Sequence, residues 1–102
     1  MTTIPHQITL AQATAMTHAF QNATLYQGNT VASMIDSNSY NSLINQIGCV
    51  NVRTYFGLDQ NVLTIVVVGV DNLGNDMVDG IILDMAVNCP IFCHRDSPLM
   101  VK

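Results

Sequence analysis

Hydrophobic positions recur with helical spacing in the first part of the chain. The apolar residues between positions 10 and 23 share one side of a helix at about 100° per residue: Leu10, Ala13, Met16, Phe20 and Ala23. Thr9 and Gln12 have the T-x-x-Q spacing of a capping box, in which two side chains satisfy free N–H groups at a helix start. The pattern therefore predicts a helix over about residues 10–23.

A second helical pattern follows a short apolar run. Residues 31–35 (VASMI) predict a short strand, and Asp36 or Ser37 can cap the helix after it. Its expected apolar stripe consists of Tyr40, Leu43, Ile44 and Ile47. Gly48 is placed as a C-terminal stop, so a helix is expected over about residues 37–47.

The hydrophobic period changes from 3.6 to 2 after Gly48. Alternation predicts strands over about residues 50–56, 62–70 and 80–86, with turns at residues 57–61 and 71–76. In residues 62–70, both the even-numbered and the odd-numbered positions are mostly apolar. This is typical of a central strand that is covered on both faces. Tight connections predict an antiparallel β-meander, and an irregular tail is expected from about residue 88.

This order of elements predicts one α+β domain over residues 1–102, with two layers. The two helices are expected to pack on one face of a mainly antiparallel sheet. The other face would then be left uncovered, with these apolar side chains: Leu63, Ile65, Val67, Tyr55 and Ile82. Such a face is expected to be buried against another copy, most simply in a C2 homodimer.

Composition supports self-association and excludes several partners. Charged residues make up only 10% of the 102-residue chain, against roughly 25% in typical domains. Three Lys and Arg against seven acids leave a net charge of −4, so a basic nucleic-acid footprint and a polybasic membrane patch are both absent. The start of the chain lacks a targeting pattern, and its longest apolar run is too short to span a bilayer, so a cytoplasmic location is expected.

The strongest chemical pattern is the cluster formed by Cys89, Cys93 and His94. Zinc requires about four such ligands, so Cys49, His6, His18 or a second protomer would have to complete a site. Three interpretations stay open: structural thiols, a metal site, and a disulfide or redox pair. The turn that Pro90 favours predicts that Cys89 and Cys93 lie within about 7 Å of each other.

Arg53, Tyr55 and His18 are the weaker binding candidates. Arg53 lies mid-strand beside Tyr55 and is expected to pair with Asp71, Asp76 or Asp84, although it can also bind an anionic group. His18 is placed on the polar side of the first helix, where solvent exposure is favoured over a catalytic pairing with an acid.

The loop over residues 71–79 is rich in Asp and Asn, which are potential calcium ligands. The acids do not follow the order of an EF-hand, and the same residue types are required by a hairpin turn. The turn is therefore the favoured interpretation.

Three stretches also resemble a known group. LINQIGCVNVRTYFGLD, LTIVVVGVDNLGNDMVDGII and the closing CPIFC…SPL are similar to a family of small uncharacterised bacterial proteins of the Bacteroidetes. The resemblance covers most of the chain and implies a bacterial, cytoplasmic protein. It assigns no activity and no catalytic or binding residues.

Two main functions are compatible with these patterns. The first is a small non-catalytic oligomeric binding or adaptor protein, because the chain lacks a P-loop, G-x-G-x-x-G, H-E-x-x-H and G-x-S-x-G. The alternative is a thiol- or metal-dependent protein that uses Cys89, Cys93 and His94. A small hydrolase or isomerase built on His18 and an Asp is a third hypothesis. We expect no cofactor, with zinc as the only candidate.

Overall fold

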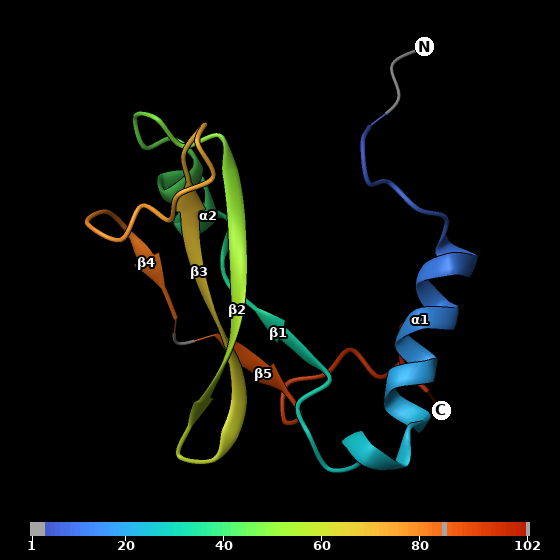
Figure 1. Ribbon diagram of the computed structural model, residues 1–102. Coiled ribbons are helices and arrows are strands. Elements are labelled where there is room, and N and C mark those ends of the chain that lie inside the picture. The colour runs from blue at the N-terminus through green and yellow to red at the C-terminus, as the bar shows by residue number, and fades with distance from the viewer. Residues whose placement is uncertain (1–3, 85, 102) are drawn as a thin grey trace.

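The computed structural model describes residues 4–84 and 86–101. Two α-helices, a short 3₁₀ helix and two antiparallel sheets follow one another along the chain (Figure 1). In order, the elements are α1 (Leu10–Asn22), η1 (Thr24–Tyr26), β1 (Ala32–Met34), α2 (Ser37–Ile44), β2 (Asn51–Asp59), β3 (Val62–Val70), β4 (Ile82–Leu83) and β5 (Val87–Cys89). The α+β class and the antiparallel meander β2-β3-β4 are confirmed.

The longest ladder joins β2 to β3. It pairs every residue of the two strands, from Asn51 opposite Val70 to Asp59 opposite Val62. Gln60 and Asn61 both have positive φ angles, of 49° and 67°, as a two-residue primed turn requires. Because two residues suffice for this turn, β2 runs on beyond its expected end at residue 56.

Of the described residues in the expected strand over 80–86, Ile82 and Leu83 form a strand, β4. The next strand, β5, lies beyond this range in the other sheet, mostly where an irregular tail is expected. Within β4, Ile82 pairs with Val68 of β3. The chain then passes to the second sheet, where Cys89 of β5 pairs with Ala32 of β1. The hydroxyl of Ser33 donates to Oδ1 of Asn88 at 2.6 Å and adds a side-chain contact to this pairing. Residue 85 of the expected strand lies outside the described residues.

Helix α2 covers part of the larger sheet. Asp36 is its N-cap, as expected, and accepts from the N–H of Ser39 at 2.9 Å. The helix ends at Ile44, before the expected residue 47, and the chain turns at Gly48 with φ +92°. Of the expected apolar stripe, Leu43 is fully buried and Ile47 is fully exposed.

The packing between α2 and the sheet is close at its C-terminal end. Oε1 of Gln46 accepts from the N–H of Ile81 at 2.8 Å, which ties the end of α2 to the segment that enters β4. A Cβ atom at Gly69 would lie 2.9 Å from Sγ of Cys49, so no larger residue fits there without displacement. The small core centres here, with Leu43 and Val67 at 0% exposure.

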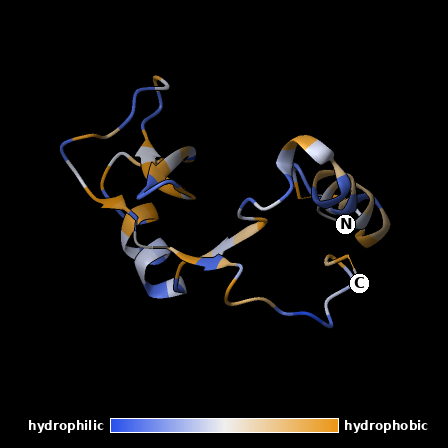
Figure 2. Cartoon of the chain, turned by 90° about the horizontal axis from the view of Figure 1, so that it is seen from below, coloured by the Kyte–Doolittle hydropathy of each residue, from blue (hydrophilic) through white to orange (hydrophobic). Residues whose placement is uncertain are grey.

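The first helix differs most from expectation, because α1 stands apart from the sheet (Figures 1 and 2). Its capping box between Thr9 and Gln12 is present, but none of its thirteen residues, all of them described, is buried. It binds a later segment instead: the side chain of Gln21 donates to the carbonyl of Leu99 at 3.0 Å and accepts from the N–H of Val101 at 2.9 Å. We call α1, η1 and residues 98–101 the α1 lobe.

The expected uncovered face also needs correction. Residues that are directly paired in an antiparallel ladder point to the same face, so Tyr55 lies with Val66 and Ile82 lies with Val68. Both are therefore on the face opposite to Leu63 and Ile65. Val67 shares the face of Leu63 and Ile65 but is fully buried, whereas those two are half-buried.

The small core makes stability depend on few side chains. We predict that Leu43→Ala lowers the free energy of unfolding by about 2–5 kcal/mol, because it opens a cavity beneath α2. Ile47→Ala is the matched control, with an expected change within about 0.5 kcal/mol, because Ile47 is fully exposed. Urea unfolding followed by circular dichroism measures both. Equal effects of the two variants would contradict this core.

The cap of α2 should make stability depend on pH. The hydroxyl and N–H of Ser39 donate to the Asp36 carboxylate and lower its pKa in the folded state. A lowered folded pKa gives stabilisation that is present at neutral pH and lost as the pH falls through that value.

We therefore predict that Asp36→Ala lowers the thermal midpoint at pH 7, and that the difference from wild type shrinks below about pH 4. Asp36→Asn keeps an uncharged cap and should retain most of the neutral-pH midpoint. Thermal scans across this pH range measure the effect. A difference that stays constant with pH would argue against a charged cap.

Candidate functional site

An apolar groove of about 680 Å³ lies between the α1 lobe and the β2–β3 hairpin, beside β1. Its lining residues carry no charged side chain and come from five segments: Phe20, Tyr26, Thr30, Val31, Ala32, Ser33, Phe56, Leu63, Thr64 and Ile65. A groove of this volume, with aromatic walls and a few hydroxyl groups, has the character of a binding site.

One wall of the groove is built by the α1 lobe. The rings of Phe20 and Tyr26 stack with their centroids 4.7 Å apart, which holds η1 against the end of α1. The hydroxyl of Thr30 then donates to the carbonyl of Leu63 at 2.6 Å and fastens the connecting segment to β3. The lobe is therefore anchored at the edge of the groove.

The opposite wall belongs to the hairpin. Phe56 pairs with Ile65 and Leu58 pairs with Leu63, so the four side chains share one face. We call these four residues the hairpin face. Phe56 is 79% exposed and Leu58 is 73% exposed, which is unusual for large apolar side chains that lie side by side.

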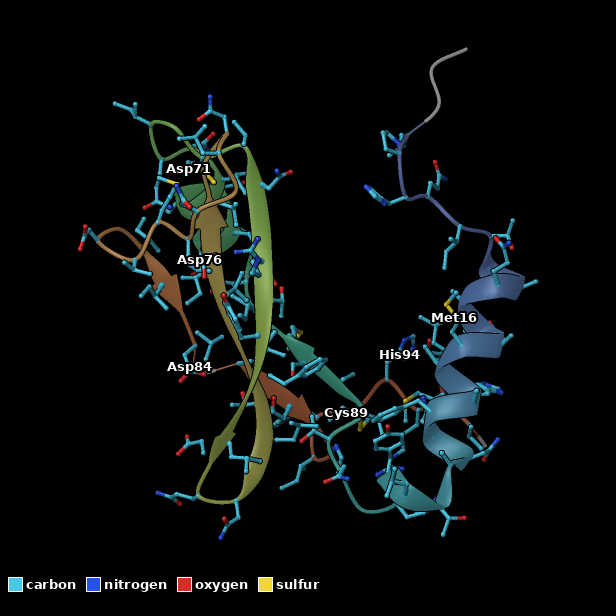
Figure 3. The ribbon with its side chains drawn as sticks, in the orientation of Figure 1. Met16, Asp71, Asp76, Asp84, Cys89 and His94 are labelled. Atoms are coloured by element: carbon cyan, nitrogen blue, oxygen red, sulfur yellow. A yellow bond between two sulfur atoms is a disulfide. The ribbon has the colours of Figure 1, made fainter. Side chains whose placement is uncertain are left out.

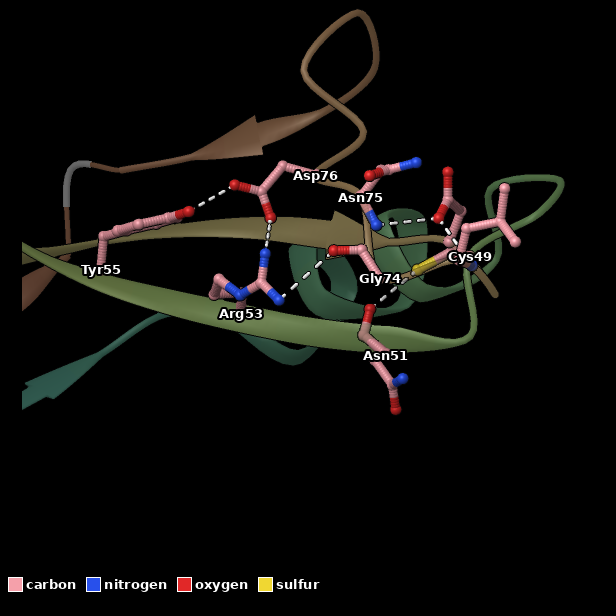
Figure 4. A network of polar contacts seen from close by, with 9 residues as sticks. Cys49, Asn51, Arg53, Tyr55, Gly74, Asn75 and Asp76 are labelled. Atoms are coloured by element: carbon pink, nitrogen blue, oxygen red, sulfur yellow. Dashed lines mark hydrogen bonds and ion pairs between the residues drawn. The ribbon is translucent and has the colours of Figure 1, made fainter.

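The other face of the hairpin carries a polar network (Figure 4). Arg53 forms an ion pair with Asp76, and the hydroxyl of Tyr55 donates to the other oxygen of the same carboxylate. Nη2 of Arg53 also reaches the carbonyl of Gly74 at 3.5 Å. Of the three acids considered as partners for Arg53, Asp76 is the one bound here.

This network fastens the loop over residues 71–79 to β2. The phenol of Tyr55 and then the charge of Asp76 raise the pKa of Arg53, so its guanidinium is cationic throughout the accessible pH range. Asp71 accepts from the N–H groups of Leu73 and Asn75, both at 2.9 Å. Its carboxylate thus shapes the turn, in agreement with the favoured interpretation of this loop.

The candidate His18 lies at the α1 lobe. Its Nε2 is 3.0 Å from the carbonyl oxygen of Pro98 and donates to it. The ring therefore helps to hold residues 98–101 against α1. No aspartate within the described residues is bound to this imidazole.

The cysteine candidates separate into a pair and a single thiol. Cys89 and Cys93 form a disulfide with their Cα atoms 4.9 Å apart, within the predicted limit of about 7 Å. Cys49 is a free thiol beside Gly69, and its Sγ donates to the carbonyl of Asn51 at 3.3 Å.

The remaining metal candidates are spread through the fold. Figure 3 shows His94 on the tail, and Asp71, Asp76 and Asp84 at different heights along the larger sheet. Within residues 4–84 and 86–101, His, Cys and Asp side chains form no cluster of three or more that could hold a metal ion. The proposed four-ligand set of Cys49, Cys89, Cys93 and His94 is thus not brought together in the described residues.

The groove is the feature that sequence reasoning missed. The hydrophobic pattern predicts Phe20 on the stripe of the first helix and Phe56 in a strand, but the two lie 36 positions apart and nothing local relates them. No pattern within one segment signals the groove, because its lining residues come together only in the folded chain. The sequence-based candidates Arg53, Tyr55 and His18 all lie outside the lining.

Comparisons of the chain with protein-family models, with curated proteins and with solved structures found no match. The resemblance to small Bacteroidetes proteins therefore stays a prediction. Among the described residues, neither helix combines the length and hydrophobicity needed to cross a bilayer.

The cysteine arrangement predicts a simple thiol count. Denatured protein that was never reduced should be alkylated at one cysteine, Cys49, and at all three cysteines after reduction. Mass spectrometry of the alkylated chain and its peptides gives both numbers. Alkylation of all three residues before reduction would show that Cys89 and Cys93 are present as thiols.

Proposed function

We propose that this protein is a small non-catalytic binding or adaptor module that works as a homo-oligomer, with a dimer favoured. The observation that carries the proposal is the accessible surface of the chain, which is 7782 Å². A compact monomer of the same mass exposes about 5,700 Å² by the usual scaling with molecular weight. The single chain therefore exposes roughly 2,100 Å² more than a self-sufficient monomer.

The size of this excess fits a permanent interface. Obligate homodimers bury about 2,000–5,000 Å² in total, or about 1,000–2,500 Å² for each partner. The radius of gyration, 15.5 Å, also exceeds the value of about 13 Å for a compact domain of this length. Both quantities agree with a chain that is more extended than a compact monomer and leaves surface for another chain to cover.

The polar candidate side chains all bind other parts of the fold, which supports a non-catalytic role. Arg53 and Tyr55 hold Asp76, and His18 holds the carbonyl of Pro98. These contacts join parts of the fold to one another and leave the apolar groove open. A binding module needs such a surface and no activated nucleophile.

A second candidate function rests on the disulfide. In a reducing cytoplasm, a pair such as Cys89 and Cys93 is expected to be a dithiol, or else a transient redox pair. A thiol-dependent role and a cytoplasmic location are therefore compatible only if the pair changes its oxidation state. Alkylation after incubation in glutathione buffers tests this, because a structural disulfide stays closed across the cytoplasmic range.

The principal proposal makes a direct prediction about mass. We expect light scattering at micromolar concentration to give a multiple of 11.1 kDa, with the dimer at about twice that value. Sample that has been reduced should give the same mass, because the contact we propose is apolar. A mass of 11.1 kDa over the whole concentration range would refute the proposed self-association.

A further inference from the structure

We propose that the hairpin face, Phe56, Leu58, Leu63 and Ile65, is the surface on which a second copy of this chain docks, with the partner's hairpin face entering the groove beside it. This inference rests on the proposed function and names the surface that the proposed dimer uses. Arg53, Tyr55 and Ile82, on the opposite face of the sheet, would remain in solvent.

The incomplete cover of this face comes from the length of α2. Eight helical residues span about 12 Å, whereas the nine residues of β3 extend about 30 Å. Val67 is buried where α2 lies over β3, but the part of the same face near the hairpin turn extends beyond the helix. The most exposed part is formed by Phe56 and Leu58 of the hairpin face, whereas Leu63 and Ile65 are half-buried.

The chemistry of the surface fits an identical partner. None of the residues that line the groove is charged, and the centres of homodimer interfaces are depleted of charge in the same way. A chain with net charge −4 repels its own copy, so a stable contact requires a patch from which the aspartates are absent. The hairpin face and the groove form such a patch.

The shape of the surface is compatible with a two-fold axis. Each copy carries both a ridge, Phe56 and Leu58, and a groove between that ridge and the α1 lobe. A two-fold operation places the ridge of one copy opposite the groove of the other, so one patch serves both sides. The two hairpins would then pack face to face, with inner side chains interdigitating as in a β-sandwich.

The extent of the exposed apolar surface distinguishes a second copy of the chain from a small ligand. A small apolar ligand in a groove of about 680 Å³ would cover Phe56 and its neighbours, but Leu58 does not line that groove and would stay 73% exposed. A second copy can cover the hairpin face and the inner side of the α1 lobe together. The extent of the hairpin face and the groove together therefore favours a second copy of the chain over a small ligand.

Two substitutions on the same hairpin test the inference. Phe56→Asp places a charge on the proposed contact, and Val62→Asp places the same charge on the opposite face near the same turn. Both side chains are exposed in the single chain, at 79% and 49%, so both variants should fold, and circular dichroism verifies this. Leu58→Lys is a second variant on the contact.

We expect wild type and Val62→Asp to be dimeric by sedimentation velocity, and Phe56→Asp and Leu58→Lys to dissociate with at least a tenfold higher dissociation constant. Dimers of all four proteins, or dissociation of Val62→Asp alone, would overturn the docking surface while leaving the proposed self-association intact. A monomeric wild type would refute both. A monomer with a radius of gyration near 13 Å in X-ray scattering would show that the single chain is compact without a partner.

Discussion

The nine-residue ladder between β2 and β3 is the constraint on which the other elements depend. Its register decides which side chains lie beneath α2, which lie beside the α1 lobe and which meet Asp76. A slip of one residue would exchange the two faces, since side chains alternate along a strand. The two-residue turn at Gln60 and Asn61 and the ion pair of Arg53 both favour the observed register.

Locally encoded features could be predicted from the sequence. Thr9 and Gln12 start α1 as their spacing indicated, Asp36 caps α2, and β3 has the predicted bounds. Each of these depends on residues within a few positions of one another. The α+β class follows from the same signals, because the change of hydrophobic period is also local.

Features that depend on distant partners could not be predicted in this way. After β4 the chain leaves the larger sheet, and β5 pairs instead with β1, which lies more than 50 positions earlier in the sequence. The groove has the same origin, because Phe20 and Phe56 become neighbours only in three dimensions. The proximity of Cys89 and Cys93 was foreseen, since three intervening residues allow it, but their chemistry was not decided by spacing.

The contact between α1 and residues 98–101 has a consequence for biosynthesis. Its hydrogen bonds join residues that are 78 to 80 positions apart, from His18 to Pro98 and from Gln21 to Leu99 and Val101. At about 5–20 residues per second, the ribosome delivers α1 several seconds before its partner segment. A single helix of thirteen residues is marginal in water, so α1 alone is expected to fluctuate between helix and coil until residues 98–101 have been made. During this interval the apolar side chains of α1 are accessible to chaperones and to other nascent chains. Neighbouring chains on one polysome can therefore meet before α1 has bound residues 98–101 in either of them.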